Sequence, residues 1–366
     1  MDPRGLTQSL FTDRARVVFD ALIRVSGSVD RSFFIMNSVL PLVSPFRLLA
    51  VSLGLCAVAL PGRAADWVGT VNSDFSLPSN WQGTPPRAGM SNPRAENFYV
   101  VNESLIAMNY TAREGDTVIG SPDASTGQFL VGTLERSGCL EMSGGSLRIF
   151  SYWSPIIGQN GNTTIGTVYV RGGTLRIGNT SRTLARERFF RVGNSRPNEK
   201  GARGVIFVSG GLVVIETEGG ADPLANSSPD SMFGGFNIGR CGADGLVYLT
   251  GGILRITSPY GTSFVPDNGP AVGILTFGLG GGVFEQTNSS RITFGTGATE
   301  SYITFTPGSK GALSLARATR KTFDDLIAVG GIRIDGAMTD PSRFLFTEEG
   351  FQGVLRLATA QSTGVK

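Results

Sequence analysis

Aromatic and arginine side chains recur at fixed distances from pairs of adjacent glycines, and they are the residues of this chain most suited to chemistry. The recurring side chains are those of Tyr169, Phe207, Tyr248, Arg148, Arg176 and Arg255. Aromatic rings can stack on the apolar faces of sugars, and guanidinium groups bind hydroxyls and carboxylates. The pattern therefore offers a possible ligand strip for an extended polysaccharide. The alternative, which we favour, is that the same residues stabilise a sheet by cross-strand stacking and cation–π pairing.

These residues are positioned by a repeated strand–corner–strand unit. The glycine pairs are Gly144-Gly145, Gly172-Gly173, Gly210-Gly211 and Gly251-Gly252. In Thr167–Gly178, apolar residues stand two and four positions before the pair (Val170, Val168) and two and four after it (Leu175, Ile177). Alternation with period two on both sides of glycine predicts two short strands that meet at a corner. Apolar side chains point inward, and the aromatic and arginine side chains point outward.

A second marker, an apolar residue followed by glycine, recurs between the corners at Gly120, Gly158, Gly193 and Gly239. The glycine pairs follow one another at intervals of 28, 38 and 41 residues. Periods of 20–50 residues are typical of solenoids and other repeat architectures. The sequence predicts an all-β fold, a parallel β-helix or β-solenoid with Gly-Gly corners, closed by an N-terminal aromatic cap and a small β-rich C-terminal cap.

Residues 1–65 are predicted to be a leader with a signal peptide, whose true start is Met36 in our interpretation. Arg47 precedes the apolar run Leu48–Leu60, and small residues follow at Ala64 and Ala65. This order is typical of secretory signal peptides, and the run is shorter than the ~20 residues of a spanning helix. We expect export to the extracellular space, cell surface or periplasm, with no membrane contact after cleavage. The alternative is a short retained membrane anchor.

The remaining chain divides into three predicted parts. In residues 66–100, Trp67, Phe75 and Trp81 are expected to plug the first coil as a cap, or alternatively to stack on sugars. Residues 101–284 are the predicted β-solenoid repeats, and 285–366 the C-terminal cap region. Within the latter, 322–331 is predicted to be a short helix with Thr322 as N-cap. Asp324 and Asp325 are then better explained by the helix dipole than as a catalytic carboxylate pair.

Composition excludes several classes of function. The chain has no histidine, which removes Ser-His-Asp and Cys-His nucleophiles and His-containing zinc sites. Residues 1–65 hold seven of the 32 basic and four of the 29 acidic residues, so 66–366 contains 25 of each. A net charge of zero argues against nucleic-acid binding. Cys139 and Cys241 lie about three repeats apart, roughly 14 Å at the spacing of stacked strands, too far for a disulfide.

The head motif Trp67-x-Gly69 with Phe75-Ser76 and Asn80-Trp81, followed by the repeats, resembles bacterial exported β-solenoid proteins of the autotransporter-associated β-strand repeat and PEP-CTERM-sorted kind. The resemblance covers roughly 66–335, and the run from Tyr302 to Gly336 looks like the closing module of such proteins. It implies secretion and a surface, matrix or adhesive role. The chain departs from the pattern in showing no Pro-Glu-Pro sorting segment and no long translocator barrel.

Three functions are compatible with these observations. The first is a secreted or cell-surface, non-catalytic structural or adhesive β-solenoid protein, and we favour it. The second is an extracellular polysaccharide-binding protein that uses the aromatic–arginine strip; other surface proteins are alternative partners. The third is a β-helix polysaccharide lyase or glycosidase, which needs carboxylates from neighbouring coils in one groove. The acidic residues of the repeats occupy different repeat positions, so we assign no catalytic or metal-binding residue and expect no cofactor. These acidic residues are Glu141, Glu216, Glu218, Asp222 and Asp244.

Overall fold

The computed structural model describes 129–133, 136–151, 154–179, 189–195, 201–217, 235–265 and 270–358, with Ser79 and several short strands before them. The chain divides into two units, Met1–Ala57 and Val58–Lys366, and all described residues belong to the second. The predictions for the leader up to Ala64, and for Phe75 and the side chains of Trp67 and Trp81, concern features outside this description.

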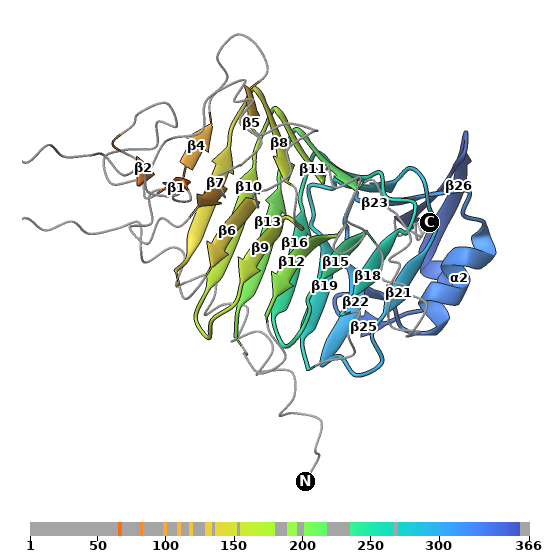
Figure 1. The fold of residues 1–366 in the computed structure, drawn as a ribbon. Coiled ribbons are helices and arrows are strands. Elements are labelled where there is room, and N and C mark those ends of the chain that lie inside the picture. Colours follow the sequence, from red (N-terminus) through yellow and green to blue (C-terminus); the bar gives the residue numbers. More distant parts are fainter. Residues whose placement is uncertain are drawn as a thin grey trace, which may run out of the picture. The chain divides into compact units, whose positions relative to one another are not determined.

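The described residues form a mostly β architecture in which three strands per coil feed three separate sheets. Each sheet contains nine described strands. Through most of the described residues, a strand is hydrogen-bonded to the strand three places before it and to the strand three places after it in the chain. The pairs that link one coil to the next are parallel, as in β10 with β13 and β13 with β16. Figure 1 shows the strands of successive coils lying side by side. The predicted all-β class, with mostly parallel sheets as in a β-helix, agrees with this topology.

The three sheets are named first, second and third in the order in which each coil visits them. The first sheet contains β1 (Ala65–Trp67), β2 (Trp81–Gln82), β3 (Phe98–Val100), β6 (Phe129–Thr133), β9 (Ile156–Gln159), β12 (Phe190–Asn194), β15 (Phe236–Ile238), β18 (Thr262–Phe264) and β21 (Ile292–Phe294). The second contains β4 (Met108–Tyr110), β7 (Gly138–Met142), β10 (Ile165–Val170), β13 (Arg203–Val208), β16 (Asp244–Leu249), β19 (Val272–Phe277), β22 (Glu300–Phe305), β24 (Ile332–Ile334) and β25 (Ala337–Met338). The third contains β5 (Thr117–Ile119), β8 (Ser146–Ser151), β11 (Thr174–Asn179), β14 (Leu212–Thr217), β17 (Ile253–Ile256), β20 (Val283–Gln286), β23 (Ala312–Ala316), β26 (Phe344–Glu349) and β27 (Gln352–Leu357).

The glycine pairs lie between the second and third sheets. At Gly173 the backbone has φ 74°, in the left-handed region that glycine enters without steric cost. The preceding Gly172 has a different constraint: a Cβ there would lie 2.7 Å from the carbonyl oxygen of Ser143 in the coil before. Adjacent coils therefore approach too closely at this bend for any side chain.

A further column of glycines lies at the second residue of successive strands in the second sheet. Its members are Gly166, Gly204, Gly245 and Gly273. A Cβ on each would clash with a backbone carbonyl of the first sheet in the preceding coil, for example that of Val131 below Gly166. The bend between the first and second sheets is thus as tightly packed as the one at the glycine pairs.

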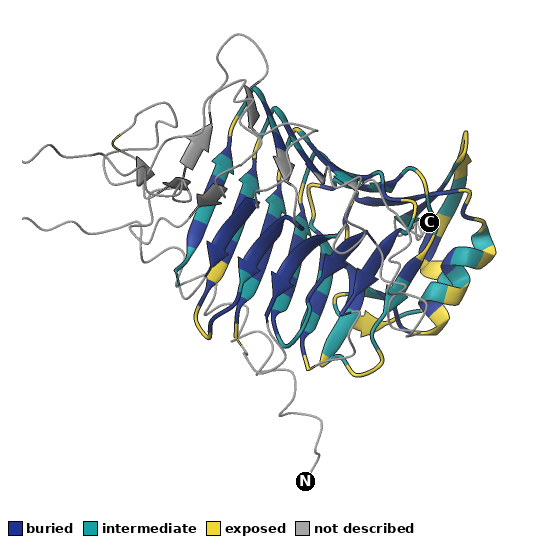
Figure 2. Cartoon of the chain, viewed as in Figure 1, coloured by how far each residue is buried: buried dark blue, intermediate teal, exposed yellow. Residues whose placement is uncertain are grey.

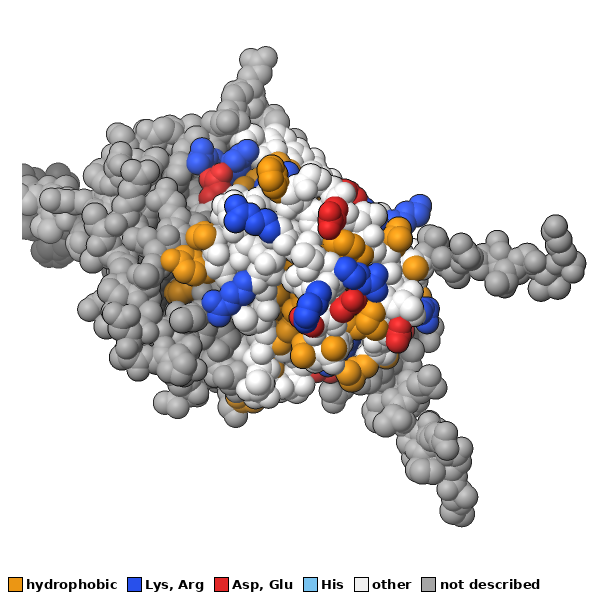
Figure 3. Space-filling view, turned by 90° about the vertical axis from the view of Figure 1, so that its right-hand side faces the viewer, with side chains coloured by type: hydrophobic (Ala, Val, Ile, Leu, Met, Phe, Trp, Pro, Cys, Tyr) orange, Lys and Arg blue, Asp and Glu red, His pale blue; other side chains and the backbone are white. Residues whose placement is uncertain are grey.

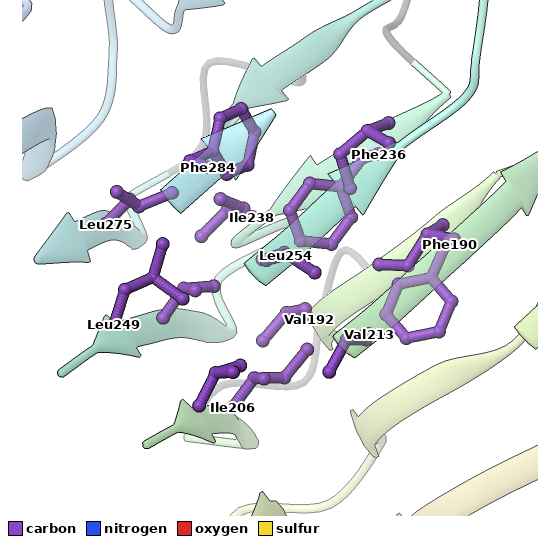
Figure 4. Packing of buried hydrophobic residues seen from close by; sticks show 14 of the residues in the cluster. Phe190, Val192, Ile206, Val213, Phe236, Ile238, Leu249, Leu254, Leu275 and Phe284 are labelled. Atoms are coloured by element: carbon purple, nitrogen blue, oxygen red, sulfur yellow. The ribbon is translucent and has the colours of Figure 1, made fainter. Parts of the chain in front are cut away.

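The core lies between the three sheets and is formed by the inward positions of every coil. Phe190, Val192, Ile206 and Val213 lie in one coil with at most 1% of their surface exposed, and equivalent side chains follow above and below them (Figure 4). Burial of each such side chain contributes roughly 1.5–3 kcal/mol. In the first sheet, β6 and β12 are buried along their whole length, whereas β7 and β16 of the second sheet alternate between buried and partly exposed residues (Figure 2).

The parallel coils continue beyond residue 284, where the sequence pattern predicts the repeats to end. β21, β22 and β23 pair in parallel register with β18, β19 and β20. The glycine pair is absent from this last coil, and Thr306–Gly311 makes the bend instead. After it, β24 pairs in parallel with β22, while β27 and β26 extend the third sheet as an antiparallel hairpin.

The helix of the C-terminal region, α2 (Arg320–Ala328), has its N-cap three residues earlier than predicted. Its N-cap is Thr319, whose side chain accepts a hydrogen bond from the Thr322 amide, and the Thr322 hydroxyl accepts one from the Thr319 amide. Asp324 and Asp325 consequently lie beyond the first turn, where they form i,i+4 ion pairs with Arg320 and Lys321. The helix-dipole explanation for these two carboxylates is therefore wrong.

Candidate functional site

The aromatic residues of the candidate strip form a continuous stack on the outer face of the second sheet. Parallel register places Tyr169 beside Phe207 and Phe207 beside Tyr248. The ring centroids are 4.8 and 4.7 Å apart, and the ring planes differ by 6° and 11°. Their spacing equals the distance between neighbouring strands, because identical positions of successive coils lie directly above one another. The rings consequently face one another along the stack.

The two ends of this stack differ. At one end of the stack, Glu141 of β7 lies beside Tyr169. At the other end, Thr276 of β19 lies beside Tyr248. The guanidinium of Arg171 lies over the Tyr169 ring, 5.6 Å from its centroid, and forms an ion pair of 2.5 Å with Glu141. The face of Tyr169 is thus engaged by a cation that is itself neutralised. Only the Tyr248 end of the stack has a small polar neighbour.

The arginines of the candidate strip lie on the third sheet, across the glycine corner from the aromatic rings. Arg148 and Arg176 are register neighbours on β8 and β11. Both bind Glu216, with nitrogen–oxygen distances of 2.9 and 2.8 Å. Arg255 binds Glu285 in the next coil at 2.7 Å. The structure therefore separates the two halves of the strip onto different sheets, and it neutralises each arginine through a carboxylate of another coil.

Burial sets the protonation of the groups around the stack. Desolvation raises the pKa of the Tyr169 and Tyr248 hydroxyls above their usual value. At Cys139, one coil before Thr167, burial raises the pKa of the thiol to about 12, and Glu141 adds to the effect. These groups stay protonated and uncharged around neutral pH. Cys139 and Cys241 form no disulfide, as their spacing predicts.

The carboxylates near the strip are held as partners of arginine. Glu141, Glu216 and Glu285 each form an ion pair with an arginine of a neighbouring or more distant coil. In the part of the chain that the structure describes, no group of three or more His, Cys, Asp or Glu residues is placed to hold a metal ion. No helix within that part is long and apolar enough to span a bilayer. What the described arrangement does chemically is to bind successive coils to each other.

A polar row on the first sheet, buried except at Thr293, is a second candidate site, and sequence reasoning missed it. Parallel register aligns Arg191, Asn237, Ser263 and Thr293 on the side of the sheet opposite the core. Asn237 is fully buried, and among the described residues neither atom of its amide group has a hydrogen-bond partner. Further along, Thr293 donates a hydrogen bond of 2.9 Å to Ser263. Strands buried on both faces show no alternation, which is why the pattern gave no signal here.

Sequence reasoning also missed the ion-pair roles of Glu216 and Glu285. Glu285 stands at the arginine position of the following coil, three residues after Gly282, so extending the alignment by one repeat would have placed it beside Arg255. Glu216 lies one residue after the inward Ile215, and its side chain reaches two different coils. That reach depends on side-chain direction at a strand end, which the alignment does not specify.

Comparisons with models of protein families, with curated proteins and with solved structures find nothing that matches this chain.

Proposed function

We propose that this chain is a non-catalytic structural or adhesive β-solenoid protein, secreted or held at the cell surface. The observation that carries the proposal is that outward side chains of the repeats are used in contacts between coils. Glu216 joins Arg148 to Arg176, and the Tyr169–Phe207–Tyr248 stack joins three coils. A surface built to bind or transform a substrate would instead leave such groups directed at solvent.

The proposal includes export and the resemblance to autotransporter-associated β-strand repeat and PEP-CTERM-sorted proteins. It rests on the sequence of the leader, on the head motif around Trp67 and Trp81, and on the repeats. We further propose that the Gly-Gly bends are the corners of a parallel β-helix, that the aromatic head closes one end, and that residues after Ala316 close the other. Closing segments shield the open strand edges of a solenoid from aggregation.

Localisation tests the proposal directly. Intact cells that express the chain are treated with a protease that does not enter them, and the fragments are compared with those from lysed cells. Exposure at the surface or recovery from the medium is the expected result. A full-length chain that is protected in intact cells and fractionates with cytoplasmic markers would overturn export and the surface role together.

Polysaccharide binding is the second candidate, and the Tyr248 end of the aromatic stack favours it. Sugar rings stack on aromatic faces, but the inner faces of this stack are occupied by neighbouring rings and Arg171 lies over Tyr169. A glycan array probed with the purified protein tests it. Binding that is lost in Tyr248→Ala and kept in Tyr169→Ala would support this site, and absence of binding to every glycan would exclude it. The lyase or glycosidase alternative is less favoured, since Glu141, Glu216 and Glu285 are all ion-paired.

A further inference from the structure

β26 is an open edge at the C-terminal end of the third sheet. It is the terminal strand in the sheet order and is six residues long, whereas the other strands that end sheets on this side, β21 and β25, have three and two residues. Two exposed apolar side chains belong to this hairpin: Leu345 on β26 is 56% exposed, and Phe351 in the turn after it is 86% exposed. Figure 3 shows the face that carries α2 and β26, where apolar and charged side chains lie intermixed.

The backbone of β26 has hydrogen-bonding groups that point away from its hairpin partner. The Ala358 amide donates to the Arg343 carbonyl, which fixes Leu345, Thr347 and Glu349 as the residues whose backbone groups face β27. The backbone groups of Phe344, Phe346 and Glu348 therefore point outward. Of these, the Phe344 amide already donates to Pro341. The amides of Phe346 and Glu348, and the carbonyls of Phe344, Phe346 and Glu348, can therefore form hydrogen bonds with an added strand.

The side chains of β26 are complementary to a second copy of the same strand. Phe344 and Phe346 pack toward the core, so Leu345, Thr347 and Glu349 lie on the opposite face. If two copies pair antiparallel about a two-fold axis at Phe346, Leu345 faces Thr347 and Arg343 faces Glu349 of the second copy. In the same register, the outward amide and carbonyl of Phe346 pair with those of Phe346 in the second copy. The outward amide of Glu348 pairs with the outward carbonyl of Phe344 in the second copy.

We propose that two copies of this chain associate through β26, in the antiparallel register centred on Phe346, and so join their third sheets into one. The occupant is a second copy rather than another polypeptide because basic Arg343, directly before the strand, and acidic Glu349, at its end and already bound by Arg356 of its own hairpin at 2.7 Å, are brought together by a two-fold axis. An isologous interface requires this kind of self-complementarity.

Oligomeric state and a charge exchange test the proposal. The full chain is expected to sediment with twice the mass of one chain. Arg343→Glu places two acidic side chains opposite each other and is expected to weaken dimerisation about tenfold or more, and Arg343→Glu/Glu349→Arg is expected to restore it. Arg291→Glu, the same charge change at an exposed site before β21, is the matched control and leaves the dimer unchanged.

A cross-linking pair tests the register itself. Leu345→Cys/Thr347→Cys is expected to give disulfide-linked dimers under mild oxidation, because these positions face each other across the axis. Either single variant is expected to stay unlinked, since each new cysteine then lies diagonal to its copy, near or beyond the limit for a disulfide. A monomer in sedimentation, a dimer indifferent to the charge changes, or equal cross-linking of a single variant would overturn the proposal. These outcomes are independent of whether the protein is exported.

Discussion

At the glycine pairs around Gly172 and Gly210, close approach of the preceding coil constrains both glycines, and a left-handed backbone constrains the second one as well. In the second position, at Gly173, the constraints are a positive φ of 74° and the carbonyl oxygen of Gly145, with which a Cβ would clash. In the first position the constraint is the carbonyl oxygen of the preceding coil, which a Cβ on Gly172 or Gly210 would meet. Gly144 occupies the same position one coil earlier, yet a Cβ there meets no atom within 4 Å among the residues that the structure describes.

Gly210→Ala is therefore expected to lower the free energy of unfolding by about 1–3 kcal/mol, the cost of forcing an extra methyl group against fixed backbone. Gly144→Ala should change it by less than about 0.5 kcal/mol. Chemical denaturation of the two variants beside the parent chain measures the difference. Equal effects would mean that the coils do not approach each other as closely at Gly210 as the structure shows.

The Cys139 thiol should react slowly in the folded protein. Its pKa of about 12, against an ordinary 9.0, makes the thiolate roughly a thousandfold scarcer at pH 8, and the thiolate is the reactive form. Alkylation by iodoacetamide, followed at this residue by mass spectrometry, should be slower by a comparable factor than in the denatured chain. Rapid modification of Cys139 in native protein would contradict the raised pKa of its thiol.

The same shift predicts a loss of stability in alkali. The thiol titrates near pH 9 when unfolded and near 12 when folded, so its contribution is intact below pH 9 and is lost as the pH rises through 12. The pKa of the Tyr302 hydroxyl is raised from 10.0 to about 12, chiefly by burial, and its titration changes the stability in the same direction. The midpoint of urea denaturation is expected to fall across this range, and to fall less in Cys139→Ala.

At the scale of strands, the sequence predicted those elements in which one face is buried and the other is not. The inward positions around Gly172, such as Val168 and Ile177, alternate with polar neighbours and are buried as expected. The strands of the first sheet could not be predicted from alternation, because residues such as Arg191 and Asn237 are buried on the face opposite the core. The end of the repeats was misplaced for a related reason: the last coil loses its glycine pair but keeps its strands.

The candidate site could be predicted only in part. Register alone stacks Tyr169, Phe207 and Tyr248, so their alignment in the sequence was sufficient to bring them together. The arginines required knowledge of which sheet each strand joins and which carboxylates lie within reach. The direction of the Glu216 side chain, which decides the coils that it reaches, is not encoded in residue spacing. Helix α2 shows a similar limit, since Thr319 and Thr322 both satisfy the preference for an N-cap.

Glu216 links three strands of the third sheet and tests whether these ion pairs stabilise the stack of coils. Glu216→Gln removes the charge that Arg148 and Arg176 share and leaves the two guanidinium groups as neighbours. Because all three side chains are partly exposed, we expect a loss of only about 0.5–1 kcal/mol, diminishing at high salt. Glu348→Gln, at an exposed carboxylate with no ion pair among the described residues, is the control for denaturation in low and high salt. A salt-independent loss would argue against an electrostatic role.

At the scale of all the described residues, the three mostly parallel sheets join each coil chiefly to the coil before and the coil after it. Stability in such a stack is approximately a sum of terms for single coils and for neighbouring pairs. The effect of a core substitution should therefore remain local, unlike in a domain whose core is shared by all elements. The C-terminal region offers the clearest place to test this, because α2 and β26 cover only the last coils.

Phe323→Ala removes a fully buried ring of α2 that packs 5.8 Å from the ring of Phe346. The loss is expected to be about 3–5 kcal/mol, the usual cost of a buried phenylalanine. In hydrogen-exchange mass spectrometry, protection should fall in β22, β23 and β27 and remain close to that of the parent in β10 and β13. Phe236→Ala, a substitution of equal size in a central coil, should instead reduce protection on both sides of β15. Uniform loss of protection along the chain in both variants would show that the solenoid unfolds as a single cooperative unit, because the coupling between coils would then exceed the stability of any one of them.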